Sequence, residues 1–181
     1  MISDSVPWKE ELIKVAGRLE KKGDQKSWTE RSSFLVERDI MVSAYALRKL
    51  KESRKLSDAM DVKRVTVLRH ELTGRVPDVW DRHQIWESYN LEGGTEVVIG
   101  LSELCNQIVH SWVWVLSADE LTGLFDGVFV SSDRERKKYL YFIPLGVLIS
   151  LFRDAGEEDV HTIIMERDKN GNMHFIEKIA D

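Results

Sequence analysis

Asn106 and His110 are the two polar side chains of this sequence that are best placed to do chemistry together. They stand four positions apart, so on a helix they lie one turn from each other and their side chains can meet. A histidine that a polar neighbour holds in one tautomer can give or take a proton near neutral pH. The spacing equally fits a structural role, in which the two groups satisfy each other or nearby backbone at the edge of the core.

The stretch from Ser102 to Trp114 is predicted to be the helix that carries this pair. Ser102 suits an N-cap position, and an apolar stripe recurs at helical spacing at Leu101, Cys105, Ile108 and Trp112. Cys105 is therefore expected to be a small buried residue and not a reactive thiol. Because it is the only cysteine, an intrachain disulfide and a cysteine-based metal cluster are excluded, and no metal or other cofactor is expected.

Several common catalytic motifs are absent. The sequence has no G-x-G-x-x-G, no Walker A loop and no G-x-S-x-G elbow, which argues against dinucleotide, nucleoside triphosphate and α/β-hydrolase chemistry. The segment Asp168 to Asn172 resembles the start of a calcium loop, but its glycine comes two positions early. It is predicted to be a hairpin turn instead.

Composition describes an ordinary soluble chain. With 181 residues, 43% hydrophobic and 31% charged, one domain is expected. The net charge of -5 argues against nonspecific polyanion binding by the whole surface but leaves room for a local basic patch. No signal peptide is recognised, and the longest uncharged apolar run, residues 139–152, is too short to span a bilayer. The sequence thus predicts a cytoplasmic protein without membrane contact.

The first half of the chain is predicted to be mainly helical. Apolar spacing indicates helices over 7–22 and 28–56, the second with Ser27 as N-cap. The second helix has an apolar face wide enough for a core helix or for one that also meets a second protomer. Residues 62–90 are expected to be extended or irregular with a short helix over 77–89, in which Trp80 and Trp86 pin the connection to the helices. The alternative places the histidines of this connection, His70 and His83, on the rim of a site.

The second half is predicted to be β-rich. After a short strand at 95–99, hairpins are expected from 127–132 with 138–143 and from 161–167 with 172–179, separated by a helix over 145–155. The predicted fold class is α+β: an N-terminal helical bundle followed by a small antiparallel β-sheet with one short helix. Residues 1–181 would form a single domain, with 1–116 helical and 117–181 the β-rich part packed on it.

The connection of the first predicted hairpin is locally basic. Residues 133–138 hold two acidic and four basic side chains, the latter being Arg134, Arg136, Lys137 and Lys138. These four residues are candidates for contact with a nucleic-acid backbone. The alternative is that they form a solvated turn.

The segment L-C-N-Q-I-V-H-S-W, residues 104–112, together with the helical chain before it, resembles the terminal motif of the HEPN domains (higher eukaryotes and prokaryotes nucleotide-binding). That motif is an arginine, a polar residue that is often asparagine, and a histidine a few residues later. Asn106 and His110 match it, whereas Cys105 stands where the arginine belongs. The resemblance implies a dimerising helical bundle and, as in many members, metal-independent ribonuclease activity in toxin-antitoxin, CRISPR or phage-defence systems.

The missing arginine divides the functional hypotheses. A cysteine supplies no fixed positive charge, and loss of such a group commonly lowers a rate about 10²-fold or more. The leading hypothesis is therefore a catalytically degenerate HEPN-like module that dimerises or associates with RNA, in bacterial defence or a toxin-antitoxin pair, with a homodimer, RNA or another protein as partner. The second is a metal-independent endoribonuclease in which His110 is the acid/base, Asn106 orients it, and another arginine such as Arg69 or Arg82 restores the charge. The third is a structural adaptor unrelated to HEPN domains.

Overall fold

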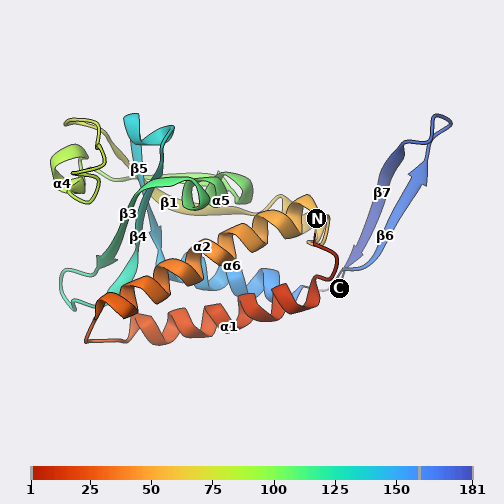
Figure 1. The fold of residues 1–181 in the computed structure, drawn as a ribbon, viewed down its shortest axis with the longest axis horizontal. Helices are drawn as coiled ribbons and strands as arrows, with labels where there is room; N and C mark the ends of the chain where they lie inside the picture. The colour runs from red at the N-terminus through yellow and green to blue at the C-terminus, as the bar shows by residue number, and fades with distance from the viewer. Residues whose placement is uncertain (1, 159, 181) are drawn as a thin grey trace.

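Two long helices open the chain in the computed structural model, which describes residues 2–158 and 160–180. They are α1 (Val6–Gly23) and α2 (Glu30–Glu52), and α1 packs against α2 and against the later helix α6 (Leu145–Glu157) (Figure 1). Thr29, in extended backbone, is the N-cap of α2 and accepts a hydrogen bond from the Ser32 N–H. The prediction of Ser27 as N-cap and of residue 56 as the helix end was wrong by a few residues.

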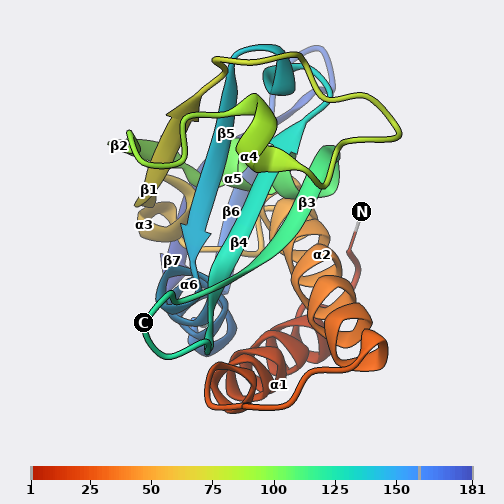
Figure 2. The same ribbon diagram turned by 90° about the vertical axis from the view of Figure 1, so that its left-hand side faces the viewer.

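Five antiparallel strands form the central sheet (Figure 2). In chain order they are β1 (Arg64–Glu71), β2 (Thr95–Gly100), β3 (Ser111–Ala118), β4 (Phe125–Ser132) and β5 (Tyr139–Pro144), and in space they run β2-β1-β5-β4-β3. The predicted hairpin of β4 with β5 is confirmed, with Phe129 opposite Phe142. The α+β class is also confirmed. However, β1, β2 and most of β3 lie within residues 1–116, so the predicted order of a helical first part followed by a β-rich second part is not confirmed.

The helices cover one face of this sheet. The main core lies between that face and helices α1, α2, α5 (Leu101–Val109) and α6. It holds most of the largest fully buried side chains of the described chain, among them Leu12, Leu19, Ile40, Leu47, Leu104, Ile108, Ile143 and Phe152. A smaller cluster on the other face combines Leu140 and Val113 with Ile85 and Tyr89 from the short helix α4 (Ile85–Ser88) and the residue after it. Two further single-turn helices are α3 (Asp58–Asp61) and η1 (Glu135–Lys137).

Helix α5 is shorter than predicted. Gly100 is its N-cap, Ser102 lies within its first turn, and the helix ends at Val109 with His110 as the C-cap. The chain then enters β3, so Trp112 and Trp114 belong to a strand and not to the predicted helix over 102–114. The run S-W-V-W-V alternates aromatic and β-branched residues, which suit a strand, and pairing with β4 decides the outcome.

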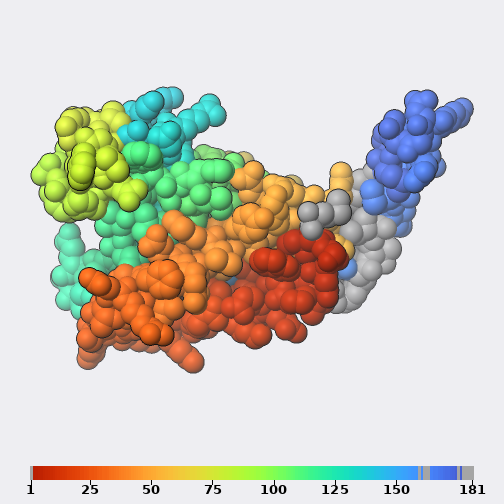
Figure 3. Space-filling view, viewed as in Figure 1, coloured from red at the N-terminus to blue at the C-terminus, as the bar shows by residue number. Residues whose placement is uncertain are grey.

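The last hairpin stands apart from the body. Strands β6 (Val160–Arg167) and β7 (Met173–Ala180) pair with each other in a separate two-stranded sheet. This confirms the predicted hairpin but not its predicted packing on the helical part, because the arm projects from the body (Figures 1 and 3). Glu158 anchors its root: the carboxylate accepts hydrogen bonds from the backbone and hydroxyl of Ser57, and Lys9 Nζ donates to its carbonyl at 2.7 Å. Among the described residues, no helix has the length and apolar character needed to cross a membrane.

Candidate functional site

An open cleft of about 760 Å³ lies where α2, α5 and the β4–β5 connection meet. It is lined by Arg48 of α2, by Glu103, Asn106, Gln107 and His110 of α5 and its cap, and by residues 132–135 of the connection. Both predicted catalytic residues, Asn106 and His110, are exposed on its wall. Arg134, one of the four predicted nucleic-acid contacts, lines the same cleft.

Arg48 places its guanidinium against the His110 ring. The Nη1 atom of Arg48 lies 3.2 Å from Nε2 of His110. Because a guanidinium can only donate, this contact is a hydrogen bond in the tautomer whose Nε2 accepts. The Arg48 Nε group also donates to Glu52 Oε1 at 2.9 Å, one helical turn away. A fixed positive charge therefore stands beside the histidine even though Cys105 supplies none.

The two arginines that the sequence suggested for this role lie elsewhere. The guanidinium of Arg69 packs over the Tyr139 ring, 4.2 Å from its centroid, and Arg82 is exposed in the connection before α4. Arg48 went unnoticed because it is one of several basic residues along α2 and lies 62 positions before His110. No local spacing relates the two.

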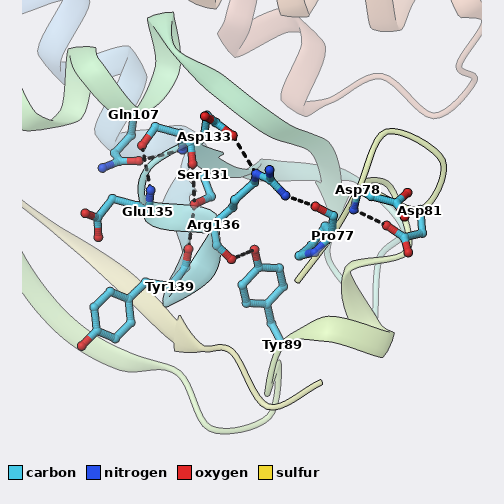
Figure 4. Close-up of polar contacts among 11 residues, drawn as sticks. Pro77, Asp78, Asp81, Tyr89, Gln107, Ser131, Asp133, Glu135, Arg136 and Tyr139 are labelled. Atoms are coloured by element: carbon cyan, nitrogen blue, oxygen red, sulfur yellow. Dashed lines mark hydrogen bonds and ion pairs between the residues drawn. The ribbon is translucent and has the colours of Figure 1, made fainter. Parts of the chain in front are cut away.

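The backbone around His110 is fixed on both sides. Its N–H donates to the Asn106 carbonyl at 3.1 Å, and its carbonyl accepts from the Asp133 N–H at 3.3 Å. Next to it, the buried Gln107 side chain accepts from the Ser132 N–H at 2.9 Å (Figure 4). Within the described residues, no hydrogen bond joins the Asn106 and His110 side chains. Both face the cleft instead of satisfying each other at the edge of the core.

Cys105 is buried in the core beneath the cleft. Burial raises the pKa of its thiol to about 12, and the nearby charges of Arg48 and Lys51 offset this only in part. The thiolate is therefore scarce at neutral pH, and Cys105 cannot act as a nucleophile. The prediction of a small buried residue at this position is confirmed.

Arg136 does not reach the cleft. Its guanidinium lies 4.5 Å from the centroid of the Trp112 ring, its Nε donates to Asp133 Oδ1 at 2.9 Å, and its Nη1 donates to the Pro77 carbonyl. The Tyr89 hydroxyl donates to the Arg136 carbonyl at 2.8 Å (Figure 4). With only 16% of its side chain exposed, Arg136 joins the β4–β5 connection to the connection before α4. Its role as a nucleic-acid contact stays a prediction, and two of its nitrogens, Nε and Nη1, already donate within the protein.

The remaining predicted basic contacts lie outside the cleft. Lys137 and Lys138 are exposed on the same connection but do not line the cavity. The residues that sequence reasoning missed are Arg48, Glu103, Gln107, Ser132, Asp133 and Glu135. Their convergence depends on the meeting of three elements, which no motif reports.

The cleft carries charges of both signs. Arg48 and Arg134 are opposed by Glu103, Glu135 and Asp133, the last of which is already paired with Arg136. Burial, followed by the charges of Glu135 and Glu103, raises the pKa of the neighbouring Tyr141 hydroxyl to about 12. Such a site suits a ligand that offers both an anionic group and hydrogen-bond donors. Within residues 2–158 and 160–180, no group of histidine, cysteine, aspartate and glutamate side chains is arranged to hold a metal ion.

Comparisons with known proteins identify no relative. No protein-family model matches the chain, and neither a curated protein nor a solved structure matches it. The geometry of the cleft is therefore the basis for assigning a function.

Proposed function

We propose that this protein associates with single-stranded RNA and holds one phosphodiester group in the cleft between Arg48, His110 and Arg134. The contact of Arg48 Nη1 with His110 Nε2 at 3.2 Å carries the proposal. A planar guanidinium is suited to bind phosphate oxygens through two donors, and an imidazole beside it can add a third. The resemblance of residues 104–112 to the HEPN motif supports the same ligand.

The acidic residues of the cleft fit a nucleotide better than a bare phosphate ion. Glu103 and Glu135 line the same cavity as the two arginines. Carboxylates accept hydrogen bonds from the amino groups of bases, and unpaired RNA presents those base edges freely. The cavity volume of about 760 Å³ lies within the range typical of small-molecule sites, about 300–1,000 Å³, which is enough for one nucleotide unit.

Metal-independent cleavage of the bound RNA is the second candidate function, and the position of His110 beside Arg48 in the cleft favours it. A phosphate that draws the donors of Arg48 frees His110 Nε2 to accept the proton of a ribose 2'-hydroxyl. The 2'-oxygen then attacks the adjacent phosphorus and the bond to the 5'-oxygen breaks. The products are a 2',3'-cyclic phosphate and a 5'-hydroxyl that takes up a proton from water, to which His110 later returns its own, while Arg48 stabilises the charge on the phosphoryl oxygens.

Dimerisation through α2 is a further part of the proposal. The outer face of α2 leaves Phe34, Val42 and Tyr45 exposed, and a groove of about 290 Å³ lies between this helix and α1. Exposed apolar side chains on one helix are typical of a surface that meets another protein. The resemblance to HEPN domains, which typically dimerise, supports a homodimer and a setting in bacterial defence or a toxin-antitoxin pair.

Binding is tested with a fluorescently labelled, unstructured 12-nucleotide RNA in EDTA at low salt, followed by anisotropy. Arg48→Ala and His110→Ala should each weaken binding, the former by about 10- to 100-fold because a charged hydrogen bond is lost. Arg31→Ala is the matched control, since Arg31 is exposed on the same helix but outside the cleft. Equal affinities for wild type, Arg48→Ala and His110→Ala would exclude the cleft as the binding site.

Cleavage is tested separately. RNA and the same sequence carrying 2'-deoxyribose at every position are incubated with wild type and His110→Ala in EDTA. The second candidate function predicts cyclic-phosphate products only from RNA and only with wild type. If RNA stays intact with and without divalent metal, cleavage is excluded and the binding proposal stands on the anisotropy data.

A further inference from the structure

Residues 75–87 form an excursion from the body that displays two indole rings to solvent. Trp80 is 84% exposed and Trp86 is 62% exposed. The sequence predicted that these tryptophans pin the connection to the helices, but Ile85 and Tyr89 are the residues buried there. Tryptophan is highly buried on average in folded proteins, so two exposed indoles on one short segment point to a binding role.

Hydrogen bonds hold the excursion in one shape. At its root, the N–H groups of Thr73 and Gly74 both donate to the Ser88 carbonyl at 2.9 Å. Near its tip, the Asp78 N–H donates to Asp81 Oδ1 at 2.6 Å, and the Trp80 N–H donates to Asp78 Oδ1 at 2.8 Å. The Trp80 backbone is therefore fixed before any ligand arrives, which lowers the entropy lost on binding.

The excursion is joined directly to the cleft wall. Arg136 bridges Pro77 of the excursion and Asp133 of the β4–β5 connection (Figure 4). The Asp133 N–H in turn donates to the His110 carbonyl. At the root, the Leu72 N–H donates to the Lys138 carbonyl at 2.8 Å. Lys137 and Lys138 are exposed on this same connection, which contacts both the cleft wall and the excursion.

We infer that Trp80 and Trp86 form a stacking platform for bases of a single-stranded RNA that runs from the cleft past Lys137 and Lys138. The inference rests on the proposed function of the cleft. It adds that the protein contacts a longer stretch of RNA than the one nucleotide held in the cleft. Base stacking on an aromatic side chain is worth about 5- to 150-fold in affinity per base and tolerates any sequence. The lysines meet the backbone phosphates along this path.

The surroundings of the two indoles favour RNA over a protein partner. Most exposed residues around them are polar, including Arg82, His83 and Glu87, and Val79 is the one other large apolar side chain exposed within 75–87. A protein interface normally buries a contiguous apolar centre. Single rings set among polar groups suit stacking, in which each base meets one ring.

The test compares affinities for RNAs of 2, 4, 8 and 12 nucleotides in EDTA. The wild-type affinity should rise with length, whereas Trp80→Ala/Trp86→Ala should bind the dinucleotide normally and lose at least tenfold for the 12-mer. Trp80→Phe/Trp86→Phe should keep most of the affinity because a ring remains. Leu121→Ala is the control, since Leu121 is a 96% exposed apolar side chain outside the cleft, α2 and residues 75–87. Circular dichroism of each variant checks that it is folded.

The outcomes separate the two proposals. If the alanine double variant binds the 12-mer as tightly as wild type, the platform is wrong and the cleft proposal survives. If wild type binds RNA of every length equally weakly and Arg48→Ala has no effect, the proposed function fails and the platform fails with it. A 12-base-pair duplex that competes as well as the single strand would also overturn the platform, because paired bases cannot stack on the indoles.

Discussion

The hairpins β4–β5 and β6–β7 are paired in the same antiparallel way, yet their surroundings differ. β4–β5 lies inside the sheet, with β3 on one side and β1 on the other, and its Val128, Leu140 and Ile143 are fully buried. Within the described residues, β6 and β7 pair only with each other and leave Ile164 and Ile176 exposed. The comparison shows that strand pairing defines a hairpin, whereas burial against neighbouring strands and helices stabilises it.

Strand pairing alone contributes little. An isolated two-stranded hairpin is at best marginally stable in water, and further strands or a covering helix supply most of the stabilisation. β4–β5 has both, whereas β6–β7 is held to the body at its root through Glu158. The arm should therefore open without unfolding the body.

The largest expected difference comes from one substitution made in both hairpins. Ile143→Ala in β5 should lower the free energy of unfolding by about 2–5 kcal/mol, because it leaves a cavity in the core. Ile176→Ala in β7 should change it by less than about 0.5 kcal/mol, because that side chain is 52% exposed. Chemical denaturation followed by tryptophan fluorescence measures both. Equal losses would mean that the arm contributes to the core.

Replacing one glycine in each hairpin gives a second pair of substitutions to compare. A Cβ at Gly127 of β4 would lie 2.5 Å from the Ile143 carbonyl oxygen, so Gly127→Ala should destabilise the body by about 1–3 kcal/mol. Gly171 has φ +86° at the arm turn, and Gly171→Ala should strain that turn by about 1 kcal/mol. Amide hydrogen exchange should quicken in residues 160–180 only. A shift of the global midpoint by Gly171→Ala would contradict the independence of the arm.

Arg136 should matter to the β4–β5 connection more than its neighbour does. Arg136→Ala removes the contacts with Trp112, Asp133 and Pro77 and should destabilise the protein by about 1–2 kcal/mol. Lys137→Ala, at an exposed position, is the matched control and should be neutral. Hydrogen exchange should show faster opening of residues 75–87 in Arg136→Ala. Unchanged exchange there would show that Arg136 does not hold the excursion.

The smallest expected effect concerns pH and the arm turn. The His174 hydrogen bond, at 2.9 Å, and the backbone N–H of Asn172 lower the pKa of Asp168 to about 2. Because the pKa is lowered, the carboxylate stabilises the turn fully at pH values above the pKa of Asp in the unfolded chain, about 3.9. This stabilisation is lost as the pH falls toward 2. Arm amides of wild type and Asp168→Ala should differ at pH 5 and converge near pH 2. If the difference in amide exchange between wild type and Asp168→Ala stayed the same from pH 5 to pH 2, the titration of Asp168 would not be its cause.

Local signals were sufficient for the elements that depend on neighbours in sequence. Apolar periodicity located α1 and most of α2, and the Asn170-Gly171 pair located the β6–β7 turn. The sheet order was not predictable in this way, because β1 pairs with β5, as in Arg69 opposite Tyr141. The end of α5 was missed for a related reason: pairing of residues 111–118 with β4 overrides a helical spacing that extends to Trp112.

In the candidate site, too, residues marked by local spacing were predicted, whereas those placed only by tertiary packing were not. Asn106, His110 and Arg134 were identified from residue type and spacing, and the fold brings them to one cleft. Arg48 was missed because only the packing of α2 on α5 places it beside His110. The packing of Arg136 against the Trp112 ring was also missed, because a basic residue in a polar turn gives no sign of that contact.

The strand order also sets the sequence of events on the ribosome. β1 is synthesised long before β5, its central partner, and α1 packs against α6, the last helix of the body. Neither contact can form until residues 139–157 have been made. Folding of the body must therefore wait for most of the chain to emerge, and the nascent helices and β1 need protection from aggregation until it does.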